Sequence, residues 1–232
     1  MTALDTASAL DACKAVVARE GVELILPGDV RREAVVLALA AYHRLRSGEA
    51  GWDVDHARQN VSVAVPSLGP ARTLLSAIPV VGEVFKLLPD RGGIYLAPSA
   101  LRDAPTLIGT VAHEIGHHRR VARGGLMWCV AYGAAPEARA ADEAACYGQD
   151  VTAQALLGGG DPDALCDACE RSLGRYDLDD ESALLARAVL GVARRSLRAR
   201  APMGGPVVDI IKELEARGVE LPEDARVTVV PS

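Results

Sequence analysis

Residues 113–117 read His-Glu-Ile-Gly-His, an H-E-x-x-H pattern that composition alone rarely produces in a chain with only 5 His. On an α-helix, positions i and i+4 lie only about 40° apart around the axis, so the imidazoles of His113 and His117 can bind one metal ion. Glu114 lies beside that face, within reach of a water molecule on the ion. A metal ion makes such a water acidic enough to be a nucleophile, with Glu114 as the general base. The pattern therefore predicts metal-assisted hydrolysis.

The segment around the motif has the signals of a helix with two different faces. Asp103 is a good N-cap, Pro105 falls in the first turn, and Gly124 with Gly125 marks the end. The face that carries the histidines has small or polar residues, namely Thr106, Gly109, Thr110 and Arg120. The other face is apolar and is predicted to be buried; it holds Ile108, Val111, Ala112 and Ile115. This pattern favours a functional histidine face over two surface histidines that share the spacing by chance.

The identity of a third metal ligand is less direct. Zinc is the usual ion for two histidines and a carboxylate, and it leaves a fourth position for water. No histidine follows the motif except His118, which lies about 100° around the helix and cannot join the site, so an acid is expected. We favour Glu143 over Glu137, because an acid in the first turn of a helix is already explained by the helix dipole. Asp142 and Asp150 are the remaining candidates.

Two side chains share the predicted helix face of Glu143. Tyr147 and Asp150 follow it at i+4 and i+7, and Asp150 is expected to orient a metal-binding residue through a hydrogen bond. The tyrosines that could donate to an oxyanion are Tyr95, Tyr132, Tyr147 and Tyr176.

Over residues 93–157, the order of strand, H-E-x-x-H helix, loop and glutamate-bearing helix resembles that of the zincin metallopeptidases. The resemblance is closest to the gluzincin branch, especially the ImmA/IrrE type and other minimal gluzincins. It implies a Zn²⁺ enzyme that hydrolyses peptide bonds in a protein or peptide substrate. In those families the peptide lies along an edge strand before the active helix, which implies that residues 92–97 bind substrate. The implied substrate-binding residues are Gly93, Ile94, Tyr95 and Leu96.

A second hypothesis remains open from the same residues. Gluzincins usually place an acid four residues after the glutamate ligand, and neither Glu137 nor Glu143 fits that spacing cleanly. The alternative is a zincin-like binding or regulatory module, in which the metal is structural and the partner is bound but not cleaved. The presence of Glu114 argues against it, because a purely structural site has no use for a general base.

The surrounding elements predict an α+β fold that is mostly helical with a small sheet, in one zincin-like domain over residues 1–232. We expect a helical hairpin over 1–50, a catalytic core over 51–160 and a helical extension over 161–232. Short strands are predicted at 22–26, 61–65, 93–97 and 226–230, and helices at 3–19, 29–46, 105–124, 136–157, 181–200 and 206–217. The arginines of the helix at 181–200 form either a solvated face or a surface for the adjacent acidic segment.

Composition excludes several classes of protein. The net charge of -6 makes nucleic acid an unexpected partner. The apolar segment 74–88 is interrupted by Pro79 and Glu83, so we expect no transmembrane segment, and a buried helix is favoured there over a lid or a membrane-surface contact. The first residues lack a secretory signal, which predicts a cytoplasmic protein without disulfides. We interpret the C-x-x-C at 166–169 as two helix residues rather than a redox or zinc motif.

The chain is rich in small residues, with 40 Ala and a single Phe. Part of this excess is expected from coding bias. Gly109, Ala112 and Gly116 nevertheless lie on the motif helix, and alanines surround Glu143 on the next one. We therefore predict that these two helices pack closely enough for side chains of both to share one ion.

Overall fold

The computed structural model describes residues 4–47, 54–65, 67, 91–176, 178–202 and 204–225. It is mostly helical with a small three-stranded sheet, which confirms the α+β expectation. The chain divides into two compact units, one made of Met1–Val16 with Asp103–Ser232, here the helical unit, and the other of Val17–Arg102, here the sheet unit.

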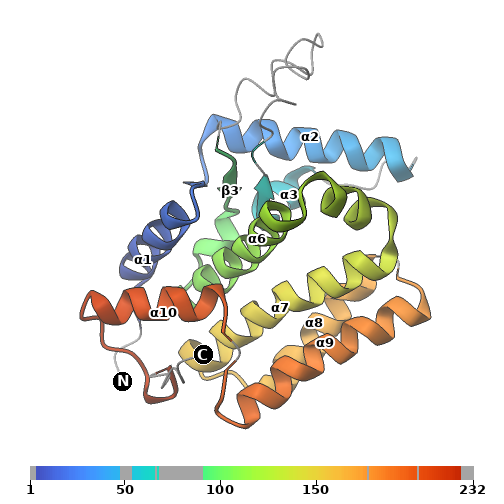
Figure 1. Ribbon diagram of the computed structural model, residues 1–232. Helices are drawn as coiled ribbons and strands as arrows, with labels where there is room; N and C mark the ends of the chain where they lie inside the picture. The colour runs from blue at the N-terminus through green and yellow to red at the C-terminus, as the bar shows by residue number, and fades with distance from the viewer. Residues whose placement is uncertain are drawn as a thin grey trace. The chain divides into compact units, whose positions relative to one another are not determined.

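The helical unit is built around one central helix. It contains α6 (Ala104–Ala134), α7 (Pro136–Gly158), α8 (Pro162–Leu173), α9 (Asp180–Arg198) and α10 (Pro206–Ala216), with 3-10 turns at Gly174–Tyr176 and Glu223–Ala225. α1 (Thr6–Arg19) begins in this unit. α7 packs against α6 on one side and against α8 and α9 on the other (Figure 1), and buried residues occur all around it. Side chains on α7 can therefore reach both neighbours.

Local signals explain where these helices begin and end. The Asp103 carboxylate accepts a hydrogen bond from the Thr106 amide at 2.8 Å, as expected of an N-cap, and α7 ends at Gly159 in the left-handed conformation with φ 66°. Asp161 and Asp179 cap α8 and α9 in the same way. The predicted helices of this unit are confirmed, and Cys166 and Cys169 lie in a helix as expected, although no bounds were predicted for α8.

Helix α6 contains one break, at Gly125. Its φ of 56° and ψ of -145° are not helical, and they suit glycine because it has no Cβ. The sequence predicted the end of the motif helix here, but a second helical stretch follows at 126–134. The break turns that stretch so that its aromatic side chains reach the histidines, as described below.

The predicted close packing of α6 and α7 is confirmed at two glycines. A Cβ on Gly109 would lie 3.0 Å from Oδ1 of Asp150, and a Cβ on Gly116 would lie 2.9 Å from Sγ of Cys146. Two alanines of α7 near Glu143 pack against other helices than the expected α6. Ala140 and Ala144 are fully buried against α8 and α9, in a cluster completed by Leu173, Ala186 and Leu190.

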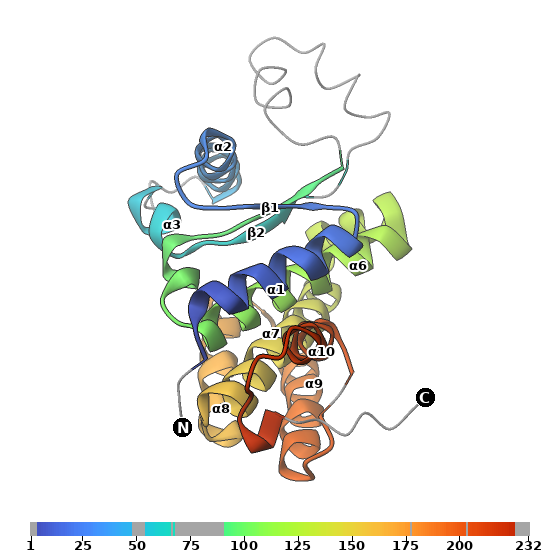
Figure 2. The same ribbon diagram turned by 90° about the vertical axis from the view of Figure 1, so that its left-hand side faces the viewer.

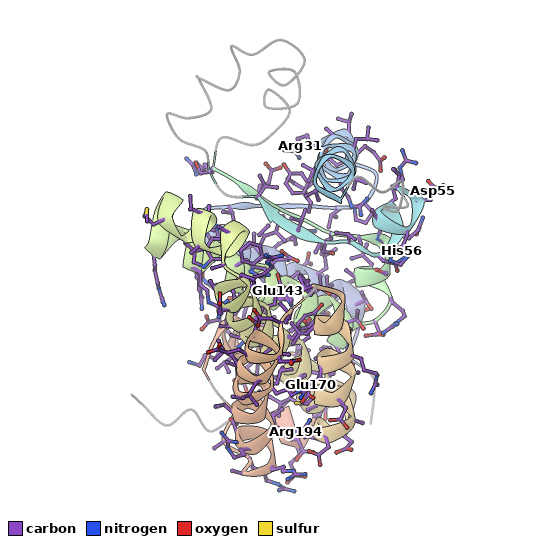
Figure 3. The ribbon with its side chains drawn as sticks, turned by 90° about the vertical axis from the view of Figure 1, so that its right-hand side faces the viewer. Arg31, Asp55, His56, Glu143, Glu170 and Arg194 are labelled. Atoms are coloured by element: carbon purple, nitrogen blue, oxygen red, sulfur yellow. The ribbon has the colours of Figure 1, made fainter. Side chains whose placement is uncertain are left out.

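The acidic α8 and the basic α9 are joined by ion pairs. Nη2 of Arg194 lies 2.6 Å from Asp167 and 3.5 Å from Glu170, and Figure 3 shows Glu170 and Arg194 on neighbouring helices. The adjacent acidic segment therefore covers part of the arginine face. Such exposed pairs each stabilise a fold by less than about 1 kcal/mol.

The sheet unit holds three short strands and two helices: β1 (Glu23–Ile25), α2 (Val30–Ser47), α3 (Val54–Asn60), β2 (Val63–Val65) and β3 (Gly93–Tyr95), with a 3-10 turn at Pro98–Leu101. The strand order is β1-β3-β2, with β1 parallel and β2 antiparallel to β3 (Figure 2). Val35 and Leu39 of α2 pack on Ile25 and Tyr95 of this sheet.

The prediction that residues 92–97 form an edge strand is wrong. β3 is the central strand, hydrogen-bonded on both sides, and all six residues of 92–97 are buried. Gly93, Ile94 and Tyr95 thus have no free strand edge for a peptide, and Leu96 donates its amide hydrogen to the Ile25 carbonyl. Among the described strands, the outer ones are β1 and β2.

Four further expectations concern the rest of the chain. The segment 74–88 and the strand at 226–230 lie outside the described residues. No helix in the described ranges combines the length and apolarity needed to cross a membrane. All five cysteines are free, and Cys166 and Cys169 lie in α8.

Candidate metal centre

The two motif histidines lie one turn apart on α6, and their Nε2 atoms converge to 3.1 Å. Each ring is oriented from behind by an acid of α7. Nδ1 of His113 lies 2.7 Å from Oδ2 of Asp150, and Nδ1 of His117 lies 2.6 Å from Oδ2 of Asp142. A carboxylate at Nδ1 favours the tautomer whose Nε2 lone pair is free to bind a metal.

Glu143 on α7 faces the same point from the other helix. One of its oxygens lies 3.7 Å from Nε2 of His113, and the other lies 3.6 Å from Nε2 of His117. Its side chain is only 4% exposed, deep among the helices (Figure 3). Tyr132 donates its hydroxyl hydrogen to Oε1, and Tyr176 donates to Oε2 at 3.0 Å. The carboxylate is therefore fixed in place from both sides.

These donors fit a zinc ion. Ligand atoms about 2.0–2.1 Å from a tetrahedral zinc are about 3.3 Å from one another. The separations of 3.1, 3.6 and 3.7 Å among the two Nε2 atoms and the carboxylate oxygens are close to that value. Two imidazoles whose Nδ1 atoms contact carboxylates, with a third carboxylate near their Nε2 atoms, are a donor set suited to Zn²⁺.

Cys146 is a second candidate for the third ligand. His113, His117 and Cys146 form a group whose ligand atoms all lie within 4.8 Å of one another, so this group could hold a metal ion. Sγ of Cys146 is fully buried and accepts a hydrogen bond from Nη1 of Arg120 at 3.0 Å. The sequence did not single out Cys146. Its position three residues after Glu143, on the same helix face, is the signal that could have identified it.

The remaining acids of the motif region are placed differently. Glu114 is 6% exposed and lies next to the histidine face on α6. Glu137 is exposed in the first turn of α7, about 9 Å along the helix axis from Glu143. The structure thus brings Glu143, and not Glu137, to the histidines.

Aromatic rings line the site. The ring of Tyr147 meets that of His113 edge-on at 5.0 Å between centroids. Trp128 and Tyr132, from the stretch after the Gly125 break, stack on each other at 5.0 Å and lie 6.3 and 6.0 Å from the ring of His117. These rings shield the histidines from water and leave their side chains 12% and 14% exposed.

The charges of the site shift the pKa values of its members. Burial opposes the charged form of His117, but the hydrogen bond with Asp142 and the interactions with Cys146 together outweigh it and raise the pKa of His117 to about 10. The Asp150 carboxylate raises the pKa of His113 in the same way, against the effect of burial. Glu143 is also buried, yet the nearby imidazoles of His113 and His117 lower its pKa to about 2. Without a metal, the carboxylates favour protonation of the imidazoles, while the hydrogen bond between the two Nε2 atoms requires one of them to keep its lone pair.

The tyrosine hydroxyls stay protonated. Burial first, and then the neighbouring Glu143 carboxylate, raise the pKa of Tyr132 and of Tyr176. Of the four tyrosines predicted as donors, these two contact Glu143, whereas Tyr95 lies in the sheet unit.

Comparison of the chain with protein-family models, with curated proteins and with solved structures finds no match.

Proposed function

We propose that the protein is a zinc-dependent metallopeptidase of the gluzincin type, with a protein or peptide as substrate. The observation that carries the proposal is the convergence of both Nε2 atoms and the Glu143 carboxylate on one point, beside the buried Glu114. A bound zinc ion would lower the pKa of a coordinated water and polarise the peptide carbonyl.

The side chains have separate roles in this proposal. His113, His117 and Glu143 hold the ion, and Asp150 and Asp142 orient the two imidazoles through their Nδ1 atoms. The carboxylate of Glu114 accepts the proton of the attacking water and passes it to the leaving amine. The aromatic rings around the histidines limit the access of bulk water.

The test is the Glu114→Gln protein, loaded with zinc and assayed on quenched fluorescent casein and on a peptide library. We expect zinc content to match the wild type and hydrolysis to fall by about 10²- to 10⁴-fold, because the general base is lost while the ligands are kept. Hydrolysis by this variant at the wild-type rate would exclude the mechanism.

A second function, a binding or regulatory module with a structural metal, is favoured by one observation. Cys146 lies close enough to both histidines to be a ligand. If Cys146 and Glu143 both bound the ion, four protein ligands would close the site and leave no position for water. A wild-type protein that binds zinc tightly but hydrolyses neither substrate would favour this reading.

A further inference from the structure

Arg120 connects the metal centre to a residue that the proposed reaction does not use. It lies on α6, three residues after His117, and its Nη1 donates to three acceptors on α7. These are Oδ1 of Asp142, the Asp142 carbonyl at 3.1 Å and Sγ of Cys146 at 3.0 Å. Because the other oxygen of Asp142 faces Nδ1 of His117, one carboxylate links the guanidinium to the imidazole.

The two acids behind the histidines differ in their surroundings. The Asp150 side chain is 27% exposed, so water can solvate its charge. The Asp142 side chain is 4% exposed, and a carboxylate buried to that degree is costly unless it is paired. A zinc-bound His117 is neutral and cannot serve as that partner. Arg120 is the cation in direct contact with Asp142.

We propose that Arg120 is a positioning residue for the metal centre, which acts through Asp142 to hold His117 in its metal-binding orientation. This inference rests on the proposed metal site. The guanidinium holds one carboxylate oxygen, which leaves the other fixed opposite Nδ1 of His117. Without Arg120, Asp142 would be free to rotate away from Nδ1 of His117.

A double-mutant cycle on the full chain tests the inference, with zinc affinity measured by competition with a chromophoric chelator. We expect Arg120→Ala to weaken zinc binding by about 10- to 100-fold, as is typical of residues that support a metal ligand. In the Asp142→Asn background the same change should weaken it by less than about 3-fold, because the route through Asp142 is already lost. Arg120→Lys should recover part of the affinity, since it keeps the charge but not the planar fork.

Arg119 supplies the matched control. It is the adjacent residue on α6, and its guanidinium pairs with Asp209 of α10 at 2.7 Å, whereas the acids that contact the histidines lie on α7. Arg119→Ala should therefore leave zinc affinity unchanged. If Arg120→Ala does not fold, the pair Arg120→Gln and Arg120→Lys replaces it, and the glutamine protein should bind zinc more weakly than the lysine protein.

The outcomes separate this inference from the proposed function. Arg120→Ala is compared in the wild type and in the Asp142→Asn protein. If it weakens zinc binding equally in both, or in neither, the positioning role is overturned while the metal site is left intact. A lower melting temperature with unchanged affinity would mean that Arg120 only ties α6 to α7. A wild-type protein that binds no zinc would overturn both proposals.

Discussion

At the scale of single residues, acidic groups outnumber basic ones around the histidines. Asp142, Glu143 and Asp150 lie against the two imidazoles, and Arg120 contacts Asp142. Glu114 is buried beside them. A divalent ion would offset part of this negative charge, and so would a proton on an imidazole without an ion, so the cluster favours cations of either kind.

The choice of third ligand is the sharpest prediction at this scale. Glu143→Ala should weaken zinc binding by more than about 100-fold, because a ligand matters more than the residues that support one. Cys146→Ala should leave it nearly unchanged. Glu137→Ala is the matched control, since this glutamate is exposed on the same helix. Competition with a chelator measures all three, and a larger loss from Cys146→Ala than from Glu143→Ala would reverse the assignment.

Most of this cluster could be predicted because it depends on helical spacing. The 3.6-residue period places His113 and His117 together, and it places Asp150 on the face of Glu143. Spacing alone could also have identified Cys146, whereas the contacts of Arg120 could not be predicted, because they depend on the distance and rotation between α6 and α7. Those are set by close contact at the glycines of α6, which sequence patterns do not measure.

At the scale of elements, the break at Gly125 decides which rings reach the site. The sequence predicted a helix end at this glycine, and its dihedral angles are indeed not helical. It did not predict that a second helical stretch follows and carries Trp128 and Tyr132 to His117. Whether a chain continues as helix after a glycine depends on what the next turn can pack against.

Gly125→Ala tests that element. Its φ of 56° with ψ of -145° is a region that residues with a Cβ avoid, so we expect unfolding free energy to fall by about 1–3 kcal/mol. Trp128 fluorescence should change as the stretch 126–134 shifts. Gly133→Ala is the control, because that glycine is helical with open space around it. Alanine there should raise the free energy of unfolding by about 0.5–1 kcal/mol. Urea denaturation measures both, and equal effects would exclude strain at Gly125.

At the scale of the whole molecule, the sheet shows the limit of local patterns. The strands β1, β2 and β3 fall inside predicted segments, yet β3 was expected at an edge and lies at the centre. Its partner β1 is some seventy positions earlier in the chain and pairs with it in parallel. Strand order of this kind is determined by long-range packing, which alternation of residues within one strand does not encode.

The exchange of protons for metal gives a prediction for overall stability. A histidine whose pKa is raised by folding stabilises the fold fully below its unfolded pKa of about 6.5, and the effect is lost as the pH rises through the folded pKa. For His117 that value is about 10. The metal-free protein should therefore lose stability between pH 6.5 and 10, whereas the zinc form should not.

Differential scanning fluorimetry with and without zinc measures this linkage. The increase in melting temperature caused by zinc should be larger at pH 8.5 than at pH 6.0. His113→Ala should abolish the increase at both pH values. If the increase in melting temperature is equal at the two pH values, or larger at pH 6.0, zinc does not displace protons from the imidazoles when it binds.

We propose that His113, His117 and Glu143 hold the ion while Cys146 stays outside its coordination sphere. X-ray absorption spectroscopy at the zinc edge of the zinc-loaded wild-type protein identifies the ligand atoms. We expect nitrogen and oxygen neighbours at about 2.0–2.1 Å, with outer-shell scattering from two imidazoles. A sulfur neighbour at about 2.3 Å would contradict it, because the only thiol near both histidines is Cys146 in the part of the chain that the structure describes.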